Sequence, residues 1–158
     1  MSHSHAPRLN YFAAAPDAYG LLAKLSQTLH AAGLDPLLIS LVELRASQIN
    51  GCAFCIDMHW NDLIKMGEDP RHLNAVAGWR EAPFFTERER AALRWAELVT
   101  NTPHSDASDE EFARLREHFS DEEIAELSFV IVTINSWNLL NVSLRNPVPL
   151  KAPYVAAA

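Results

Sequence analysis

The sequence predicts an all-α protein, because helical signals run through the chain and no strand pattern accompanies them. Apolar residues recur at three- and four-residue intervals, and no stretch shows the alternation of a half-buried strand. Asp-Pro pairs at 35–36 and 69–70 and three Ser/Thr-x-x-Glu capping boxes mark helix starts. With 158 residues, 49% of them hydrophobic, the chain can bury the core of one domain. We expect about seven helices over residues 16–146, between an N-terminal arm (1–15) and an extended C-terminal tail (147–158).

The boundaries of the predicted helices follow from their first and last residues. In an Asp-Pro pair, Asp caps the helix N-terminus and Pro occupies the first helical position, where it fits without loss. In a capping box, Ser or Thr and the Glu three residues on bind each other's backbone N–H groups, which also marks a helix start. Gly33 and Gly51 end the first two helices. His30, on the last turn of the first helix, is expected to be solvated or to cap the C-terminus. The predicted helices cover about residues 16–32, 36–49, 52–66, 70–80, 87–100, 109–118 and 121–145.

The last predicted helix is the most apolar element of the chain. Apolar residues surround nearly its whole circumference, so we expect it at the centre of the domain or at a subunit interface. Asn135, Asn138 and Asn141 interrupt it too often for a membrane span. Asn135, Asn138 and Arg145 share one side, and we interpret this polar seam as structural hydrogen bonding rather than as the lining of a pocket.

The composition excludes some classes of function. A formal net charge of −7 and a pI near 5.4, without a Lys/Arg cluster, argue against nucleic-acid binding. The first residues lack the apolar core of a secretory signal, so we expect a cytoplasmic, reducing setting in which a close cysteine pair is more often catalytic than structural. His3 and His5 in this segment are expected to be disordered rather than to hold a metal.

The stretch from Ser47 to His59 organises the prediction of function. It contains both cysteines of the chain, Cys52 and Cys55, with His59 four positions after the second. In a helix that begins after Gly51, positions 52, 55 and 59 share one face. Free N–H groups and the helix dipole at the helix start lower the pKa of a thiol there, and an imidazole one turn on is placed to exchange a proton.

Three other interpretations of this pair are weaker. Zinc can take Cys-x-x-Cys and His59 as three ligands, but the chain offers no second Cys/His pair at finger or ribbon spacing. A c-type haem requires His directly after the second cysteine, where Ile56 stands. A purely structural disulfide across so short a loop gains little stability. We therefore predict redox chemistry, with no cofactor and no metal.

A carboxylate on the preceding helix is the candidate partner of the histidine. Glu43 lies nine residues before Cys52 and orients His59 if the two helices pack closely. The alternative is a surface carboxylate that pairs with solvent or with Arg45.

Residues 44–59, Leu-Arg-Ala-Ser-Gln-Ile-Asn-Gly-Cys-Ala-Phe-Cys-Ile-Asp-Met-His, resemble the core motif of the alkyl hydroperoxidase D-like, or carboxymuconolactone decarboxylase, family. Residues 86–93 and 134–138 extend the resemblance, which spans about residues 35 to 146. It implies an all-helical fold that assembles as trimers or hexamers, and a thiol peroxidase cycle.

The resemblance also implies roles for the three residues of the motif. Cys55 is the peroxidatic cysteine that reduces a small hydroperoxide and becomes a sulfenic acid, Cys52 resolves it to a disulfide, and His59 belongs to a proton relay. A dithiol donor, thioredoxin-like or lipoyl, then restores the thiols.

Two positions depart from the best-known members of the family. Ser40 stands where they place a relay glutamate, and Phe54 stands where they carry a histidine between the cysteines. Glu43 is the first substitute for the missing carboxylate, with Glu81 and Glu89 behind it.

Two rival functions remain. The decarboxylase branch of the family suggests a cofactor-free lyase or hydrolase that uses His59 and a carboxylate, although that branch generally lacks the cysteine pair. A non-enzymatic redox sensor, in which the disulfide changes the oligomeric state, is the second. The primary hypothesis is a peroxidase-related disulfide reductase acting on small hydroperoxides.

Overall fold

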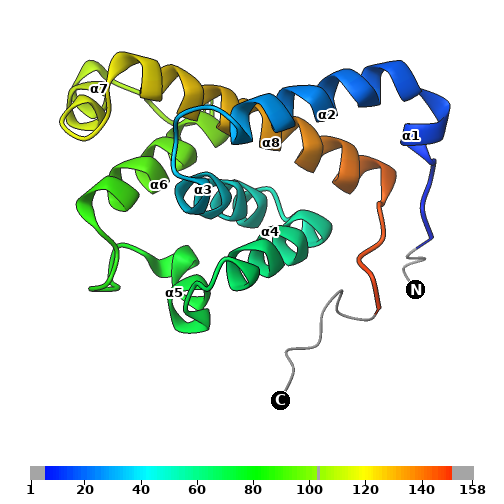
Figure 1. The fold of residues 1–158 in the computed structure, drawn as a ribbon, viewed down its shortest axis with the longest axis horizontal. Coiled ribbons are helices and arrows are strands. Elements are labelled where there is room, and N and C mark those ends of the chain that lie inside the picture. Colours follow the sequence, from blue (N-terminus) through cyan, green and yellow to red (C-terminus); the bar gives the residue numbers. More distant parts are fainter. Residues whose placement is uncertain (1–5, 103, 151–158) are drawn as a thin grey trace.

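The computed structural model describes residues 6–102 and 104–150, and every regular element in these ranges is a helix, as predicted (Figure 1). The predicted segments all contain helix, and two details differ: a short helix forms within the expected N-terminal arm, and residues 70–80 hold two short helices. The elements are α1 (Tyr11–Ala14), α2 (Pro16–His30), α3 (Pro36–Ile49), α4 (Ala53–Lys65), α5 (Pro70–Asn74), the 3-10 helix η1 (Val76–Gly78), α6 (Glu87–Thr100), α7 (Asp109–Arg116) and α8 (Asp121–Leu144).

Helix α3 lies at the centre of the domain and packs against α4, α6 and α8 (Figure 1). Asp35 caps its start by accepting the Leu37 N–H (2.9 Å), and Pro36 follows in the first turn, as the Asp-Pro pair predicted. Ser40, Glu43 and Ser47 are buried on this helix among its apolar residues. Because buried polar groups need partners, this central helix also positions polar chemistry inside the domain.

Two of the three predicted capping boxes form completely. In α6 and α8 the N-cap hydroxyl and the carboxylate three residues on bind each other's backbone N–H groups. At α7 only half of the box forms: Ser108 accepts the Glu111 N–H (3.3 Å), but the Glu111 carboxylate binds Arg94 (2.6 Å). The prediction at α7 was therefore right about the helix start and wrong about the reciprocal bond, because a full positive charge is a stronger partner than a backbone N–H.

Helix α8 runs across the domain behind α2 and contributes to the core on one side (Figure 1). By length and composition it meets the requirement for a membrane-crossing helix, and 39% of its most apolar window is buried inside the domain. Leu127, Val130 and Ile131 pack into the core. Phe129, Val132 and Leu139 are exposed, so the helix has a second apolar face turned away from the core.

The polar residues of α8 hold the turn between α3 and α4. The Asn50 side chain donates to Asn135 (2.7 Å) and to Asn138 (3.0 Å), and Asn138 donates to the Ser47 hydroxyl (3.0 Å). The structural interpretation of the polar seam is thus confirmed for Asn135 and Asn138. Arg145 caps the C-terminus of α8 in a left-handed conformation (φ 57°).

The described part of the N-terminal arm is fastened to the end of α8. Arg8 donates its backbone N–H to Leu144 O (2.9 Å) and its guanidinium to Ser143 O (2.8 Å). Tyr11 donates its hydroxyl to Asn141 Oδ1 (2.9 Å). These contacts bring the aromatic residues of the arm beside α2 and α8. His3 and His5 lie outside the described residues.

Candidate functional site

The turn between α3 and α4 places the first cysteine at a helix start. Gly51 has a positive φ of 66°, which lets α3 end and α4 begin within a few residues. Cys52 is the N-cap of α4, and its sulfur accepts the Cys55 N–H (3.3 Å). The predicted position of Cys52 at the N-cap is confirmed.

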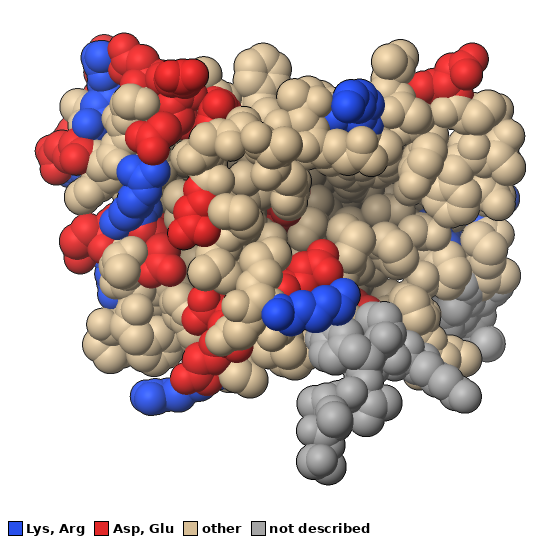
Figure 2. Space-filling model, viewed as in Figure 1, with Lys and Arg blue, Asp and Glu red and all other residues tan. Residues whose placement is uncertain are grey.

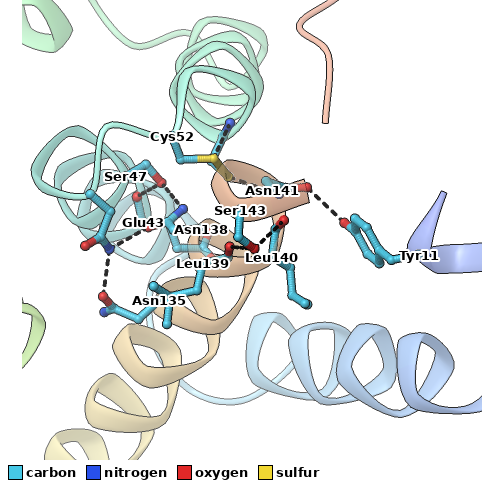
Figure 3. The surroundings of a disulfide bond; sticks show 12 residues. Tyr11, Glu43, Ser47, Cys52, Asn135, Asn138, Leu139, Leu140, Asn141 and Ser143 are labelled. Atoms are coloured by element: carbon cyan, nitrogen blue, oxygen red, sulfur yellow. Dashed lines mark hydrogen bonds between the residues drawn. A yellow bond between two sulfur atoms is a disulfide. The ribbon is translucent and has the colours of Figure 1, made fainter. Parts of the chain in front are cut away.

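Cys52 and Cys55 are joined in a disulfide with a Cα–Cα distance of 5.4 Å, and both residues are buried. Asn141, from α8, donates its Nδ2–H to Cys55 Sγ (3.3 Å). The same amide accepts the Tyr11 hydroxyl at its oxygen, which fixes the orientation of the amide (Figure 3). A thiolate at Cys55 therefore finds a hydrogen-bond donor already in place.

A carboxyl group lies between two imidazoles beside the cysteines. Glu43 Oε2 is 3.3 Å from His59 Nδ1, and Glu43 Oε1 is 3.1 Å from His30 Nε2. Arg45, the alternative partner of Glu43, binds Glu97 instead (2.7 Å). The structure thus places Glu43 next to His59. This position is the one that Glu43 needs if it is to replace the glutamate expected at position 40. The expectation for His30 was wrong: it pairs with Glu43 across two helices rather than serving only as a solvated cap.

Burial and hydrogen bonding shift the pKa values of the two histidines in opposite directions. Burial lowers the pKa of His59, and the nearby Glu43 opposes this only in part. The hydrogen bond to Glu43 raises the pKa of His30, which is partly exposed. His59 Nε2 is buried without a hydrogen-bond partner among the described residues. His59 is therefore a neutral base near pH 7, with Nδ1 toward Glu43 and Nε2 free to accept a proton.

Cys55 and His59 line one cavity of about 510 Å³, here named the Cys55 cavity. It opens between α2, α4 and α8, where the surface in Figure 2 is hollowed beneath α2. Apart from Glu43, His30 and Asp62, its walls are largely apolar or aromatic. Its aromatic side chains are Tyr11, Phe12, Tyr19, Phe54 and Trp137.

A second cavity, of about 780 Å³, is lined by Cys52 and is here named the Cys52 cavity. It lies between the start of α4 and the end of α8. Phe54, Asn141 and Asn146 line both cavities and separate them.

The other sequence candidates lie away from this arrangement. Ser40 is buried on α3, one turn before Glu43. The Glu89 carboxylate is used in the capping box of α6, and Glu81 lines neither cavity. Within the described ranges, no group of three or more His, Cys, Asp and Glu side chains is arranged to hold a metal.

Comparison with known proteins places this geometry in a family. Residues 16–98 match the Carboxymuconolactone decarboxylase family. The chain belongs to this family. Among its relatives, uncharacterized protein YdfG of Bacillus subtilis is 34% identical over 139 residues, which are 88% of this chain and 95% of that protein. Uncharacterized protein YnjA of Escherichia coli is 37% identical over 71% of this chain and 58% of its own length.

Solved structures of several proteins share the fold. ATU0492 from Agrobacterium tumefaciens, described as a protein of unknown function and a candidate antioxidant defence protein AhpD, superposes with a TM-score of 0.90 at 41% identity. The match covers 92% of this chain and all of that one. The debrominase Bmp8 superposes with a TM-score of 0.79 at 20% identity over 88% of this chain and 75% of its own, a likeness that shows the fold alone. The family and the AhpD-like fold expected from the sequence are confirmed.

Proposed function

We propose that the protein is a thiol-dependent peroxidase that reduces small organic hydroperoxides through Cys52 and Cys55. One observation carries the proposal: Cys55 and the neutral, buried His59 line the same cavity, and Glu43 lies behind the imidazole. Such a cavity brings a nucleophilic sulfur and a base to a substrate held against apolar walls.

The proposed cycle starts with Cys55 in its thiolate form. His59 Nε2 accepts the thiol proton, and the hydrogen bond from Asn141 stabilises the thiolate. The sulfur attacks one peroxide oxygen, the O–O bond breaks, and the departing alkoxide takes the proton back to leave as an alcohol. Cys55 is now a sulfenic acid. The Cys52 thiol condenses with it, which releases water and forms the disulfide.

Glu43 and His30 act on this cycle through His59. Glu43 Oε2 faces Nδ1 of the imidazole at 3.3 Å, although it makes no hydrogen bond of good geometry there, and its charge favours a proton on Nδ1, which leaves Nε2 as the acceptor atom. His30 holds the other oxygen of Glu43 and is partly exposed, so a proton can pass between His59 and solvent along these three side chains. Glu43 and His30 are positioning residues in this scheme.

An external reductant must return the disulfide to two thiols. A dithiol, thioredoxin-like or lipoyl, does this by two successive exchanges. The cycle needs no metal and no organic cofactor. It suits a reducing compartment, and we propose the cytoplasm.

We also propose that the protein assembles as a homo-oligomer, a trimer or hexamer, through the outer face of α8. Phe129, Val132 and Leu139 are 58%, 54% and 67% exposed on one helix. Large apolar side chains clustered in this way mark interaction surfaces. Sizing the protein in solution tests the assembly, and a monomer that persists at high concentration contradicts it.

Steady-state turnover tests the peroxidase. With a dithiol present, the protein should consume cumene hydroperoxide, and Cys55→Ser should abolish this consumption. Cys52→Ser is the matched comparison, because it keeps the attacking sulfur and removes only the resolving one. Undiminished consumption by Cys55→Ser rules the proposal out.

A second candidate is a cofactor-free lyase that uses His59 without the sulfurs. The unpartnered Nε2 of His59 favours it, since a buried neutral imidazole beside a carboxyl group can abstract a proton from a carbon acid. Lyase turnover has to survive replacement of both cysteines, which peroxidase turnover does not. A redox sensor would instead show a change in size between the oxidised and reduced protein.

A further inference from the structure

The two sulfurs of the disulfide belong to residues that line different cavities. Cys55 lines the cavity that contains His59, and Cys52 lines the cavity at the end of α8. Phe54 and Asn141 contribute to both and form the wall between them. A reagent in one cavity therefore lies against one of the two cysteine residues and not against the other.

Thiol–disulfide exchange makes this separation chemically significant. An attacking thiolate approaches a sulfur from the side opposite the sulfur that leaves, so the side of approach decides which cysteine is attacked. Attack at Cys52 makes Cys55 the leaving thiolate. Cys55 Sγ is the sulfur that Asn141 binds (3.3 Å), and a stabilised thiolate leaves faster.

We propose that the Cys52 cavity is the docking site of the reducing dithiol, and that reductant and hydroperoxide use opposite sides of the active site. The inference rests on the thiol cycle of the proposed function and adds to it a location and a direction of attack. In this scheme the oxidising substrate reacts at Cys55 while the reductant reacts at Cys52.

The lining of the Cys52 cavity indicates the chemistry of the reductant. Its apolar walls come from Phe54, Val142, Val148 and Leu150, and the polar Asn141 and Asn146 also line it. Arg145 is the charged residue among the lining residues, and it holds a left-handed backbone conformation that disfavours every residue with a Cβ. Arg145 therefore places a cation at the edge of this cavity. The matching ligand is a dithiol on a short alkyl chain that carries a carboxylate.

The exchange balances in two steps. The donor thiolate attacks Cys52 Sγ, a mixed disulfide forms, and the electron pair of the broken S–S bond goes to Cys55 as a thiolate. The second thiol of the donor, as a thiolate, then attacks the donor sulfur in the mixed disulfide. This closes a cyclic disulfide and releases Cys52, which takes up a proton. The donor loses two electrons and the protein gains two.

Single-turnover reduction of the full chain, oxidised beforehand with diamide, tests the docking site. The probes are dihydrolipoic acid, which has an alkyl chain and a carboxylate, and dithiothreitol, which has neither. Val142→Trp should fill the cavity, because Val142 is 48% exposed and lines only this side. Ala23→Trp is the matched control, since Ala23 lines only the Cys55 cavity. The readout is the rate at which free thiols appear.

The expected results separate the two cavities. Val142→Trp should slow reduction by both dithiols about tenfold, and Ala23→Trp should leave reduction unchanged while it slows oxidation of the reduced protein by cumene hydroperoxide. Arg145→Gly should slow reduction of the disulfide by dihydrolipoic acid about tenfold and reduction by dithiothreitol less than about twofold. Only dihydrolipoic acid carries a charge opposite to that of Arg145. Glycine relieves the left-handed strain at position 145, so Arg145→Gly should fold. If Val142→Trp does not fold, Arg145→Gly alone tests the docking site.

Unchanged reduction in Val142→Trp and Arg145→Gly overturns the docking site, as does equal slowing by Ala23→Trp. The reduction assay contains no peroxide. Failure of cumene hydroperoxide to oxidise the reduced parent protein therefore overturns the proposed function, whereas unchanged reduction rates overturn only the location of the reductant.

Discussion

The imidazole of His30 lies 3.1 Å from the Glu43 carboxyl group, on the oxygen opposite to the one that faces His59. This contact joins α2 to α3 and links the buried site to the surface. Glu43 lies one helical turn after Ser40, on the same face of the central helix, and we propose that it replaces the relay glutamate that the family resemblance implies at position 40. The consequences for catalysis, stability and thiol chemistry can be measured separately.

Replacing Glu43 with glutamine should lower the rate of hydroperoxide reduction about a hundredfold, because the variant keeps the shape of the side chain and loses the charge that holds His59 as a base. Steady-state consumption of cumene hydroperoxide measures the loss. Glu81→Gln is the control and should retain the parent rate, since Glu81 does not line the Cys55 cavity. Equal rates in Glu43→Gln and the parent would remove Glu43 from the mechanism.

The two histidines should give opposite pH dependences of stability. Burial lowers the pKa of His59 below its ordinary 6.5, so the contribution of His59 is present above that pH and is lost as the pH falls. The bond to Glu43 raises the pKa of His30 above 6.5, so its contribution is complete below that pH and is lost as the pH rises through the raised value.

Urea unfolding across this pH range tests the assignment. His59→Gln should lose less stability in acid than the parent, and His30→Gln should lose more. The same pH dependence in the parent and both variants would show that neither pKa differs between the folded and unfolded chain.

Asn141→Leu should raise the pKa of the Cys55 thiol, because the thiolate loses a hydrogen-bond donor. The ultraviolet absorbance of the thiolate, titrated in a Cys52→Ser background, measures this pKa. Tyr11→Phe should give a smaller shift in the same direction, because it only frees the amide to rotate. An unchanged pKa in Asn141→Leu would mean that Asn141 does not act on the thiolate.

Asn138→Ala should lower the free energy of unfolding by about 2 kcal/mol, because it removes the hydrogen bonds of a fully buried amide to Asn50 and Ser47 and leaves space where the amide was. Ser136→Ala is the control on the same helix; among the described residues its exposed hydroxyl bonds only to Val132 O, so the expected change is below about 0.5 kcal/mol. Equal stability in the two variants would contradict the structural role assigned to Asn138.

Local signals in the sequence were enough to predict where the helices lie and how the residues of the Cys-x-x-Cys motif are arranged at the start of α4. Asp-Pro pairs, capping boxes and Gly51 act within a few residues, so their geometry follows from the chain itself. Cys52, Cys55 and His59 share one helix, and the helical period fixes their common face. Glu43 could be predicted as a candidate because its helix directly precedes the helix of the cysteines, so that the two helices are expected to pack together.

Contacts between distant segments were not predictable in this way. His30 is a single histidine at the end of a helix, and only the packing of α2 on α3 shows that it meets Glu43. In the sequence, Asn141 only interrupts an apolar helix, and Tyr11 is one aromatic residue near the N-terminus. Their bonds to Cys55 and to each other depend on how α8 crosses α4 and where the arm is fastened.

The most direct test of the account is a count of free thiols in the reduced protein before and after one equivalent of cumene hydroperoxide. We expect the loss of two thiols per chain in the parent and the loss of one in Cys52→Ser, where the sulfenic acid has no second thiol to meet. Cys55→Ser should keep its remaining thiol. Two thiols that persist in the parent, or a Cys55→Ser variant that is oxidised as fast as the parent, would contradict the assignment of Cys55 as the attacking sulfur.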